Sequence, residues 1–495
     1  MVITGAEQPA ATTALTQPGQ HTFTCTVTDG AGAAKTASAS VNVSAPLPDT
    51  VRSGDTVADC IDLPSAQDKW TFSGTLGQRV RIVVACTSGD VQPAVQLYPP
   101  GGGTAEATGT GWSSSVTLER QLATSGQYSI VISDSGNDNT GCYNLSLLLL
   151  GGAMTSASDP DGGAIASGET ISAQVNVLSD MDGFTFSGTM GRRVRIAVTR
   201  TSGDLEPAVF LYPPGGGGAE VSDEAWYEST ASIDRQLSAN GQYTIVVEDA
   251  DADKMGGYNI TVLDLGDTLT SPIDADGGPI VSGETLSAQV NVLSDMDGFT
   301  FSGTMGRRVR IVVSRTSGDL EPAVFLYPPG GGTIEASGQA WYQSTTSIDR
   351  QLSGNGQYTV VVADADHNKL GGYNITFLDL SGSLTSATDP DGGVIYSGQT
   401  LSGQINSLSD MDAFTFVGTL GQRVRIVVTR TSGDLEPAVY LYPAGGGQAE
   451  ASDEAWYEAS ASIERQLSTG GQYTIVVQDA DDDKIGRYNI TVQAF

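Results

Sequence analysis

The sequence predicts an all-β protein: four tandem antiparallel β-sandwiches of about 115 residues each, preceded by a β-hairpin segment. Three observations lead to this prediction. One segment recurs four times, apolar residues alternate with polar residues inside it, and clusters of Gly, Pro, Asp and Ser separate the alternating runs. A period this long corresponds to a whole repeated domain rather than to the small unit of a solenoid.

The period is visible in two series of tyrosines and in one identical stretch. The stretch NVLSDMDGFTFSGTMGRRVRI occurs at 176–196 and again at 291–311. The tyrosine series keep a spacing of 115 residues; they are Tyr128, Tyr243, Tyr358 and Tyr473, and Tyr143, Tyr258, Tyr373 and Tyr488. Each unit is long enough to bury its own core. The expected bounds are 1–45 for an N-terminal segment, and 46–152, 153–267, 268–382 and 383–495 for the four repeats.

Repeat two illustrates the strands expected in every repeat. Val194, Ile196 and Val198 alternate with polar residues, which is the period-two pattern of a half-buried strand. No window shows helical periodicity with a cap, so each repeat is predicted to be a sandwich of seven or eight strands. The expected strands, in order, are 168–177, 182–188, 191–200, 206–214, the run around Ile233 to Leu237, 241–249 and 256–264.

Acidic residues dominate the charge, with 57 Asp and Glu against 24 Lys and Arg and a net charge of −33. Such a surface repels nucleic-acid phosphates and anionic membranes, and it attracts cations. No apolar run approaches the roughly 20 residues of a membrane-spanning helix. We therefore expect no nucleic-acid partner and no membrane insertion. The first residues lack the basic and apolar regions of a signal peptide, so we expect the precursor to begin upstream.

Known catalytic motifs are absent from the sequence. It has two histidines, His21 and His367, and no GxSxG, HExxH, P-loop or dinucleotide-binding fingerprint. Paired carboxylates exist, but they recur with their surroundings in several repeats, and a row of identical active sites is not expected. We predict that the protein is not an enzyme.

Four motifs recur in the same order in every repeat: D-x-[FW]-T-F-x-G-x-x-G-x-R-V-x-I, SGD-x-x-PA-V-x-LY-P, GQY-[ST]-[IV]-V-[IV] and Y-N-[IL]-[ST]. Over 46–495 this frame resembles the bacterial pre-peptidase C-terminal domain family. The resemblance implies a secreted β-sandwich, found after peptidase domains and in tandem in surface proteins. It also implies a binding or accessory role, often with calcium, and no catalysis.

The N-terminal segment differs from the repeats. The stretch GQHTFTCTVTDGAGAAKTASASVNV predicts two strands around a turn at 29–32. It resembles the last two strands of an immunoglobulin-like module of the PKD or HYR type. Such modules need about seven strands, and an isolated hairpin is marginal in water. Either the missing strands lie upstream, or the hairpin completes a sheet in a neighbouring molecule, or it docks on the first repeat.

Acidic residues gather in the turns of repeat two at 178–183, 201–206 and 249–255. Because chain direction alternates from strand to strand, these turns are expected at one end of the sandwich. Clustered carboxylates repel one another unless a hard cation joins them, and Ca²⁺ takes six to eight oxygen ligands. The sequence predicts at least one Ca²⁺ per repeat, with solvated acids in Asx-turns as the alternative. The candidates are Asp180, Asp182, Asp204, Glu206, Asp249, Asp251 and Asp253 in repeat two; Asp295, Asp297, Asp319, Glu321, Asp364 and Asp366 in repeat three; and Asp410, Asp412, Asp434, Glu436, Asp479, Asp481 and Asp483 in repeat four.

Paired acids also precede repeats two, three and four, in the joint sequences SDPDGG, DADGG and TDPDGG. A calcium ion at these places would stiffen the joint between neighbouring repeats. The alternative is a plain turn, because Asp-Pro-Asp-Gly is a strong turn former. The candidate ligands are Asp159, Asp161, Asp274, Asp276, Asp389 and Asp391.

The four cysteines, Cys25, Cys60, Cys86 and Cys142, all lie before residue 145. Their spacing does not fit a zinc site. An even number of cysteines in an extracellular chain suggests two disulfides, and four cysteines allow three different pairings. We predict Cys86–Cys142 within the first repeat and Cys25–Cys60 from the N-terminal hairpin to that repeat. Another pairing, or free buried thiols, is the alternative. Because the first repeat lacks the acidic joint sequence, we expect a crosslink to replace the metal there.

Two further features recur on the predicted surface. A Trp-Tyr pair appears in repeats two, three and four. Its rings are interpreted either as a stacking platform for a sugar or a neighbouring chain, or as an anchor at an edge or in the core. An Asn-x-Ser/Thr sequence ends each repeat, as a glycosylation acceptor or as part of a polar strand face. The positions are Trp226, Trp341 and Trp456 for the first feature, and Asn144, Asn259, Asn374 and Asn489 for the second.

Two classes of function fit these observations. The first is an extracellular structural protein of the bacterial cell surface: a calcium-stiffened subunit of a filament, rod or stalk that polymerises with itself through its N-terminal segment. The second is an accessory region of a secreted peptidase that binds a glycan or a surface protein and lacks the catalytic domain.

Overall fold

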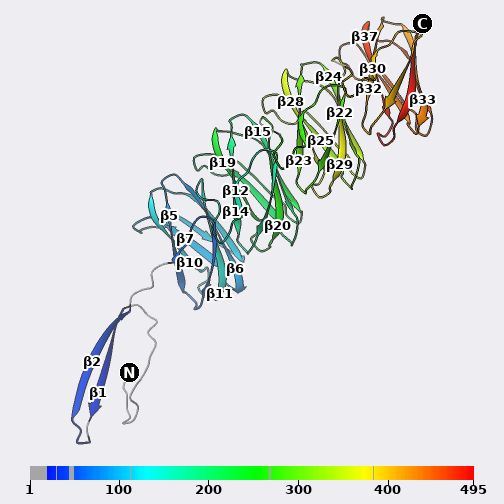
Figure 1. The fold of residues 1–495 in the computed structure, drawn as a ribbon. Coiled ribbons are helices and arrows are strands. Elements are labelled where there is room, and N and C mark those ends of the chain that lie inside the picture. The colour runs from blue at the N-terminus through cyan, green and yellow to red at the C-terminus, as the bar shows by residue number, and fades with distance from the viewer. Residues whose placement is uncertain (1–18, 29, 44–48, 112, 267–268, 383) are drawn as a thin grey trace.

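The computed structural model describes residues 19–495 except 29, 44–48, 112, 267–268 and 383 (Figure 1). In this part of the chain every regular element is a β-strand, and the strands form repeated pairs of sheets. No helix long and apolar enough to cross a membrane occurs among these residues. The predicted all-β fold of repeated sandwiches is confirmed.

The strands have matching bounds from repeat to repeat. The hairpin consists of β1 (Gly19–Thr28) and β2 (Ala34–Val43). Repeat 1 contains β3 (Asp49–Thr50), β4 (Asp55–Ile61), β5 (Gln67–Gly74), β6 (Arg79–Gly89), β7 (Pro93–Tyr98), β8 (Ala107–Thr110), β9 (Ser115–Gln121), β10 (Gly126–Asp134) and β11 (Gly141–Leu150). Repeat 2 contains β12 (Gly162–Ala164), β13 (Glu169–Val175), β14 (Met181–Gly188), β15 (Arg193–Arg200), β16 (Pro207–Tyr212), β17 (Val221–Glu224), β18 (Thr230–Gln236), β19 (Gly241–Asp249) and β20 (Gly256–Asp264).

The last two repeats follow the same plan. Repeat 3 contains β21 (Gly277–Pro279), β22 (Glu284–Val290), β23 (Met296–Gly303), β24 (Arg308–Arg315), β25 (Pro322–Tyr327), β26 (Ala336–Gln339), β27 (Thr345–Gln351), β28 (Gly356–Asp364) and β29 (Gly371–Asp379). Repeat 4 contains β30 (Gly392–Val394), β31 (Thr400–Ile405), β32 (Asp412–Gly418), β33 (Arg423–Gly433), β34 (Pro437–Tyr442), β35 (Ala451–Glu454), β36 (Ser460–Gln466), β37 (Gly471–Asp479) and β38 (Gly486–Ala494).

Each repeat is a sandwich of a five-stranded and a four-stranded sheet. In repeat 2 the orders are β12-β14-β19-β16-β17 and β13-β20-β15-β18, and the other repeats share them. All neighbours are antiparallel except the short first strand, since β12 runs parallel to β14. Nine strands therefore replace the seven or eight predicted. The two additional strands, β12 and β17, have three and four residues, too few for a period-two signal.

The interior of each sandwich is made by the alternating residues that the sequence indicates. In repeat 2, Val194, Ile196 and Val198 of β15 belong to one buried cluster with Tyr243 and Phe186. The Tyr243 and Phe186 rings stack, with centroids 5.5 Å apart. Burial of these apolar side chains is the main stabilising contribution to the sandwich.

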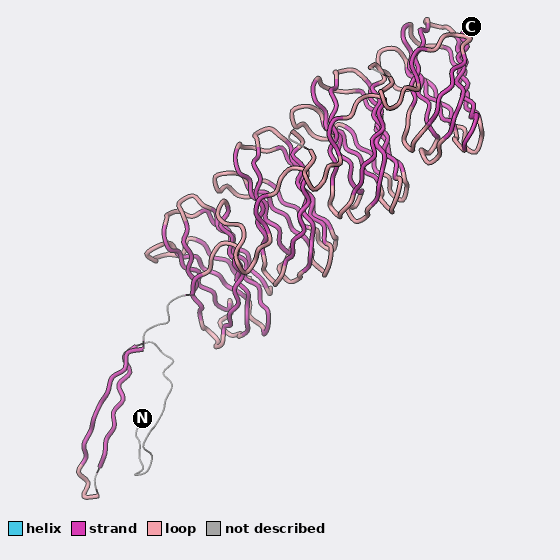
Figure 2. Tube along the Cα trace, in the orientation of Figure 1, coloured by secondary structure: helices cyan, strands magenta, loops and turns pink. Residues whose placement is uncertain are grey.

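The outer faces of the sheets pack against the neighbouring repeats. Val83 of β6 and Leu148 of β11 form a second buried cluster with Met181 of β14 and Val246 of β19. The four-stranded sheet of repeat 1 thus lies on the five-stranded sheet of repeat 2, and equivalent clusters join repeats 2 and 3 and repeats 3 and 4. The sheets form one continuous stack, seen as a row of sandwiches in Figures 1 and 2.

Strand burial follows from this stack. Strand β20 lies between two layers and is buried at every residue after the first. In contrast, the equivalent strand of the last repeat, β38, alternates between buried and accessible residues because no repeat covers its outer face.

An arginine lies at each joint, where the outer faces of two neighbouring repeats meet; it is buried at the first and third joints and half-buried at the second. Arg81 is 5% exposed, forms ion pairs with Glu119 of its own sheet and Glu248 of the next repeat, and lies 4.3 Å above the Phe210 ring centroid. The two other joint arginines lie in the same way over aromatic rings, 3.9 Å and 4.5 Å from the centroids. They are Arg195 over Phe325 and Arg310 over Tyr440. Charge pairing and stacking together make burial of the guanidinium tolerable.

The joint between repeats 2 and 3 also buries a histidine. His367 is 7% exposed, and its Nδ1 has no hydrogen-bond partner among the described residues. Ala252 and Asp482 occupy this position at the two other joints. Burial and the nearby Arg195 charge lower the pKa of His367 to about 3. The folded joint therefore holds a neutral imidazole.

The N-terminal hairpin forms a separate two-stranded sheet. Its pairing runs from Gly19 opposite Val43 to Thr28 opposite Ala34. Three hydroxyl pairs cross the strands at 2.9–3.0 Å, and residues 31–40 are all exposed. Within the part of the chain that the structure describes, no third strand joins this sheet.

Replacing Glu248 with Ala removes one of the two carboxylates that face Arg81. We expect the free energy of unfolding to fall by about 2 kcal/mol, because a buried charge loses a partner. Urea denaturation measures the change. Glu228→Ala removes an exposed acid of the same repeat and is the control, expected to change stability by less than about 0.5 kcal/mol. Equal small effects of both substitutions would contradict the role of the ion pair.

Acidification should weaken the joint that contains His367. Its pKa is lower in the folded than in the unfolded chain, so its contribution is complete above about pH 6.5 and is lost as the pH falls toward 3. At pH 5 the loss amounts to about 2 kcal/mol relative to pH 7.5. His367→Ala, which introduces the residue found at 252, should lack this component of the pH dependence. Identical pH profiles of the two proteins in denaturant titrations would refute the assignment.

Candidate metal centre at the joints

Three aspartates from two segments meet at the start of repeat 2. Asp159 and Asp161 lie in the joint segment just before β12, and Asp182 lies on β14. Strand β12 pairs with β14 so that Gly162 lies opposite Gly183, which brings the joint acids beside Asp182. Carboxylate oxygens of the three residues lie within 4.8 Å of one another. In repeat 4 the equivalent group is Asp389, Asp391 and Asp412, and in repeat 3 the group is Asp274, Asp295 and Asp297, where Asp295 is the counterpart of Asp180.

Glycine at 162 permits this close approach. Its φ is +115°, and a Cβ atom there would lie 2.4 Å from the carbonyl oxygen of Gly183. A side chain would therefore push the joint segment away from β14. The Asp-Gly-Gly element, interpreted from sequence as a turn former, thus has a second role in positioning the acids.

One carboxylate oxygen in each group is buried without a partner. Asp182 is fully buried; its Oδ2 accepts a hydrogen bond of 2.6 Å from the Tyr258 hydroxyl, while its Oδ1 accepts none from the described residues. Asp297 and Asp412 show the same arrangement. A buried oxygen that lacks a partner is costly, and a cation bound among the three carboxylates would satisfy it.

A fourth aspartate connects this group to the preceding repeat. The Oδ2 of Asp180 accepts from the Asn176 amide at 2.8 Å, and its Oδ1 accepts from the Met181 amide at 3.0 Å. The hydroxyl of Thr56 in repeat 1 also donates to Oδ1, at 3.2 Å. Asp180 therefore fixes its own turn and contacts the neighbouring sandwich.

The electrostatics of these groups favour a bound cation. Burial, reinforced by neighbouring carboxylates, raises the pKa of Asp159 and Asp295 to about 7 and of Asp410 to about 8. The same causes raise the pKa of Asp182 well above its usual range. Without a cation, Asp159, Asp295 and Asp410 would be partly protonated near neutral pH. A divalent ion removes the mutual repulsion and replaces the protons.

The second acidic group of repeat 2 already contains a positive side chain. Asp249 accepts three backbone N–H groups, from Glu206, Asp253 and Lys254, at 2.9–3.1 Å. The Lys254 ammonium lies 3.1 Å from Glu206 and 3.0 Å from Asp253, so lysine acts as the counter-ion. Oxygens of Asp249, Asp251 and Asp253 also lie within 4.8 Å of one another. In repeat 3 Lys369 pairs with Glu321 beside Asp364 and Asp366, and in repeat 4 Lys484 pairs with Glu436 beside Asp479, Asp481 and Asp483.

Other sequence candidates lie apart from both groups. Asp204, Asp319 and Asp434 are exposed and belong to no group of metal-ligating side chains among the described residues. Asp276 lies beside the repeat 3 group, and its Oδ2 accepts from the Gln289 amide at 3.0 Å. In repeat 2, the structure therefore places the acids of the joint segment beside those of the turn at 178–183 and apart from those of the turn at 249–255.

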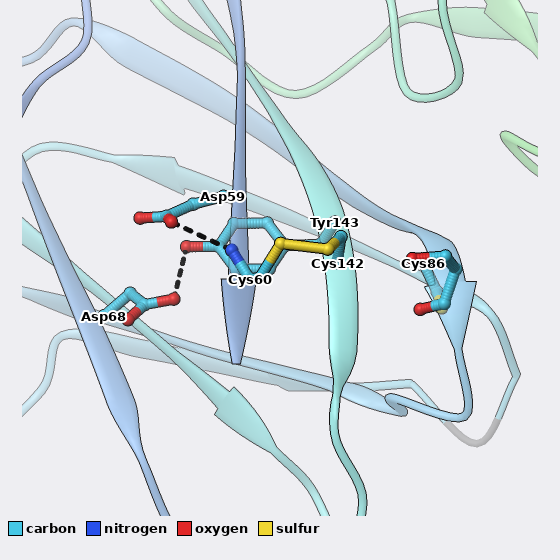
Figure 3. Close-up of a disulfide and its surroundings, with 7 residues drawn as sticks. Asp59, Cys60, Asp68, Cys86, Cys142 and Tyr143 are labelled. Atoms are coloured by element: carbon cyan, nitrogen blue, oxygen red, sulfur yellow. Dashed lines mark hydrogen bonds between the residues drawn. A yellow bond between two sulfur atoms is a disulfide. The ribbon is translucent and has the colours of Figure 1, made fainter. Parts of the chain in front are cut away.

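The predicted disulfide pairing is wrong. Cys60 bonds to Cys142, with Cα atoms 3.8 Å apart, and Cys86 is free (Figure 3). Cys60 on β4 lies directly opposite Cys142 on β11. Cys86 is instead paired with Tyr143, the next residue along β11, and the two side chains of consecutive strand residues point to opposite faces. Cys60 is therefore unavailable to Cys25, whose side chain lies outside the described residues.

Repeat 1 differs from the other repeats in this region by its disulfide. The disulfide occupies the position of the Gln174–Gly257 pair in repeat 2. Asp68 is present as the counterpart of Asp182 and accepts from the Tyr143 hydroxyl at 2.9 Å, with Trp70 donating to the same hydroxyl oxygen at 3.0 Å. Among the described residues, no group of ligating acids is found in this repeat.

Sequence reasoning missed the asparagines that connect the repeats. The Asn144, Asn259 and Asn374 side chains are buried, and each donates from Nδ2 to a backbone carbonyl of the next repeat at 2.9–3.0 Å. They occupy the sequons noted above, so the folded joint protects them from glycosylation. The available signal was the recurrence of Asn with Leu on one face of the last strand, as in Asn144, Leu148 and Leu150.

Known proteins resemble this chain only weakly. No family model and no curated protein matches the chain. Among solved structures, it is similar to the pre-peptidase C-terminal domain of a collagenase from Bacillus anthracis, at 18% identity over 21% of this chain and 94% of that one, with a TM-score of 0.18. It is also similar to a tetra-tandem repeat from the extending region of a large adhesion protein, at 10% identity over 87% and 98% of the chains, with a TM-score of 0.12. At these identities and TM-scores the similarity carries no argument about this chain.

Proposed function

We propose that this protein is an extracellular spacer, a rod of stacked sandwiches that serves as a filament subunit or surface stalk. The observation that carries the proposal is the packing of sheet on sheet at three successive joints. Joint segments are themselves fixed: Ser53 donates to the Ala153 carbonyl at 2.6 Å, and Met154 is buried between the two repeats. Rigid joints keep the two ends of the row of repeats at a fixed separation, which is what a spacer requires. The proposal assigns the chain no catalytic step.

Calcium is the proposed stiffening ion. The three groups of aspartates recur once per joint, and each combines at least one acid of the joint segment with at least one buried acid of the following sandwich. An ion held there would tie the joint segment to β14, β23 or β32. Oxygen-only ligands and negative charge suit Ca²⁺ better than a transition metal. The first group of each repeat is the proposed site, because the second group has a lysine as counter-ion.

The proposed location is the bacterial cell surface, after secretion. The Cys60–Cys142 disulfide suits an oxidising compartment, and the strongly acidic surface suits solvation outside the cell. Self-association into a homopolymer is proposed through the N-terminal hairpin. Among the described residues its two ten-residue strands pair only with each other, so both sheet edges are available to another chain.

A second candidate function is that of an accessory region which binds a glycan or a protein for a secreted peptidase of the pre-peptidase C-terminal type. The aromatic side chains exposed near the joints favour a binding role. Binding and spacing are compatible in one rod.

Calcium should raise the melting temperature, and its removal by chelator should lower it, because a ligand of the folded state alone stabilises that state. At a concentration of about 100 times Kd, the expected gain is about 2.7 kcal/mol for a site. The triple variant Asp182→Asn, Asp297→Asn and Asp412→Asn should lose the calcium response in differential scanning fluorimetry.

The matched control changes Asp204, Asp319 and Asp434 to Asn, since these acids are exposed turn residues outside both groups. This variant should keep the full calcium response. A wild-type melting temperature that does not change with calcium would refute the metal site and leave the stacked rod untouched.

Deleting residues 1–48 should abolish self-association if the hairpin provides the contact. Sedimentation velocity of the full chain over a range of concentrations should show polymers, while the truncated chain stays monomeric. Monomers in both samples would refute assembly through the hairpin.

A further inference from the structure

One turn in each of repeats 2, 3 and 4 exposes two aromatic side chains. The turn follows β17, β26 or β35 and contains Trp followed by Tyr. The tryptophans are 46–48% exposed and the tyrosines 90–92% exposed. These tyrosines are Tyr227, Tyr342 and Tyr457, and none is an anchor in the core. Trp112 of repeat 1 lies outside the described residues.

The tyrosines are held in a strained backbone conformation. Tyr227, Tyr342 and Tyr457 have φ values of 62°, 59° and 62°, in the left-handed region that bulky residues rarely adopt. Gly or Asn would adopt it at lower cost, and an exposed ring regains nothing from burial. Strain that recurs three times around an exposed aromatic ring indicates that something outside the chain contacts the ring.

At the joint between repeats 3 and 4, rings from the two repeats line the same hollow. Tyr342 of repeat 3 and Trp456 of repeat 4 border a hollow of about 510 Å³. The Trp456 Nε1 donates to Glu454 at 3.2 Å, and the Lys369 ammonium lies 5.8 Å from the Tyr342 ring centroid. Both rings are therefore oriented before any ligand arrives, which lowers the entropic cost of binding.

Polar groups form the rest of the hollow. Arg315, Gln343, Ser344 and Asp481 line it together with the two rings, so the hollow contains both donors and acceptors. The Asp481 Oδ1 atom is itself buried and lies 3.6 Å from the Lys484 ammonium, so this acid is held within its own turn. Aromatic faces at the rim with polar groups between them match the surface of a sugar, which has apolar C–H faces and hydroxyl edges.

We propose that this joint hollow binds a neutral polysaccharide, with sugar rings stacked on Tyr342 and Trp456 and hydroxyl groups hydrogen-bonded to Gln343 and Ser344. The net charge of −33 repels anionic polymers and leaves a neutral chain free to approach. A peptide fits less well, because the lining between the rings offers no apolar pocket for its side chains. The proposal goes beyond spacing: the rod adheres along its length.

The pair recurs at one other joint and is incomplete elsewhere. Tyr227 of repeat 2 and Trp341 of repeat 3 are the equivalents at the preceding joint. Repeat 1 has Ser113 in place of the tyrosine, so Trp226 has no partner ring. Tyr457 lies in the last repeat of this chain and faces no following tryptophan of it. Two sites one repeat apart would bind a long polymer with avidity.

Affinity electrophoresis of the full chain in calcium tests the proposal. The probes are four soluble neutral polysaccharides, namely β-1,3-glucan, xyloglucan, glucomannan and amylose, with polygalacturonate and gelatin as anionic and protein probes. At least one neutral polysaccharide should retard the protein. Tyr342→Asn and Trp456→Ala should each weaken that retardation by about three- to ten-fold, the usual worth of one aromatic contact.

The incomplete joints provide matched controls. Tyr457→Asn and Trp226→Ala remove the same ring types where no pair exists, and they should leave the retardation unchanged. Tyr342→Asn also relieves backbone strain, so its melting temperature should equal or exceed that of the wild type while binding falls. The proposal is overturned if no neutral polysaccharide retards the protein, if the controls weaken binding as much, or if the rings affect retardation by gelatin alone.

Discussion

Contact between the outer faces of successive sandwiches is the constraint from which the rest of this structure follows. In an ordinary sandwich each sheet has one buried and one solvated face. Here β11, β20 and β29 are buried on both faces, because the next repeat covers the outer one. The joint arginines lie in this contact, the buried asparagines donate across it, and the aspartate groups form at its rim, where the joint segment meets β14, β23 or β32.

The three joints share one design and differ in their central polar groups. The arginine of the first joint pairs with Glu248 and that of the third with Gln478, while the second joint has Ala363 at this position and adds the buried His367. Similar sandwiches in one chain risk docking on the wrong neighbour, and distinct polar pairs penalise such errors. The outer faces of the first and last sheets also differ from the faces inside the joints. Lys69 on the first sheet stands at the position of Gly183, and Gln493 on the last sheet stands at the position of Leu378. Polar outer faces of this kind terminate a stack.

Sequence periodicity predicted the sandwiches because the interior face alternates strictly, as at Val194, Ile196 and Val198. It did not predict the stacking, because polar residues such as Asn259 and Thr261 indicate a solvent-exposed face, and the structure shows that a neighbouring sheet covers them. It found every acid of the metal groups but treated Asp159 and Asp182 as two sites, since the parallel pairing of three-residue β12 leaves no pattern. The cysteine pairing failed for a related reason: which face Cys86 occupies depends on the register of β6 against β11.

Small-angle X-ray scattering from the calcium-saturated full chain tests the central claim most directly. Sandwiches stacked face to face should scatter as one stiff rod over 49–495, with a single maximum dimension and a cross-section of one sandwich. Freely jointed sandwiches would instead require an ensemble of bent shapes to fit the curve. That result would contradict the account even if every repeat were correctly folded.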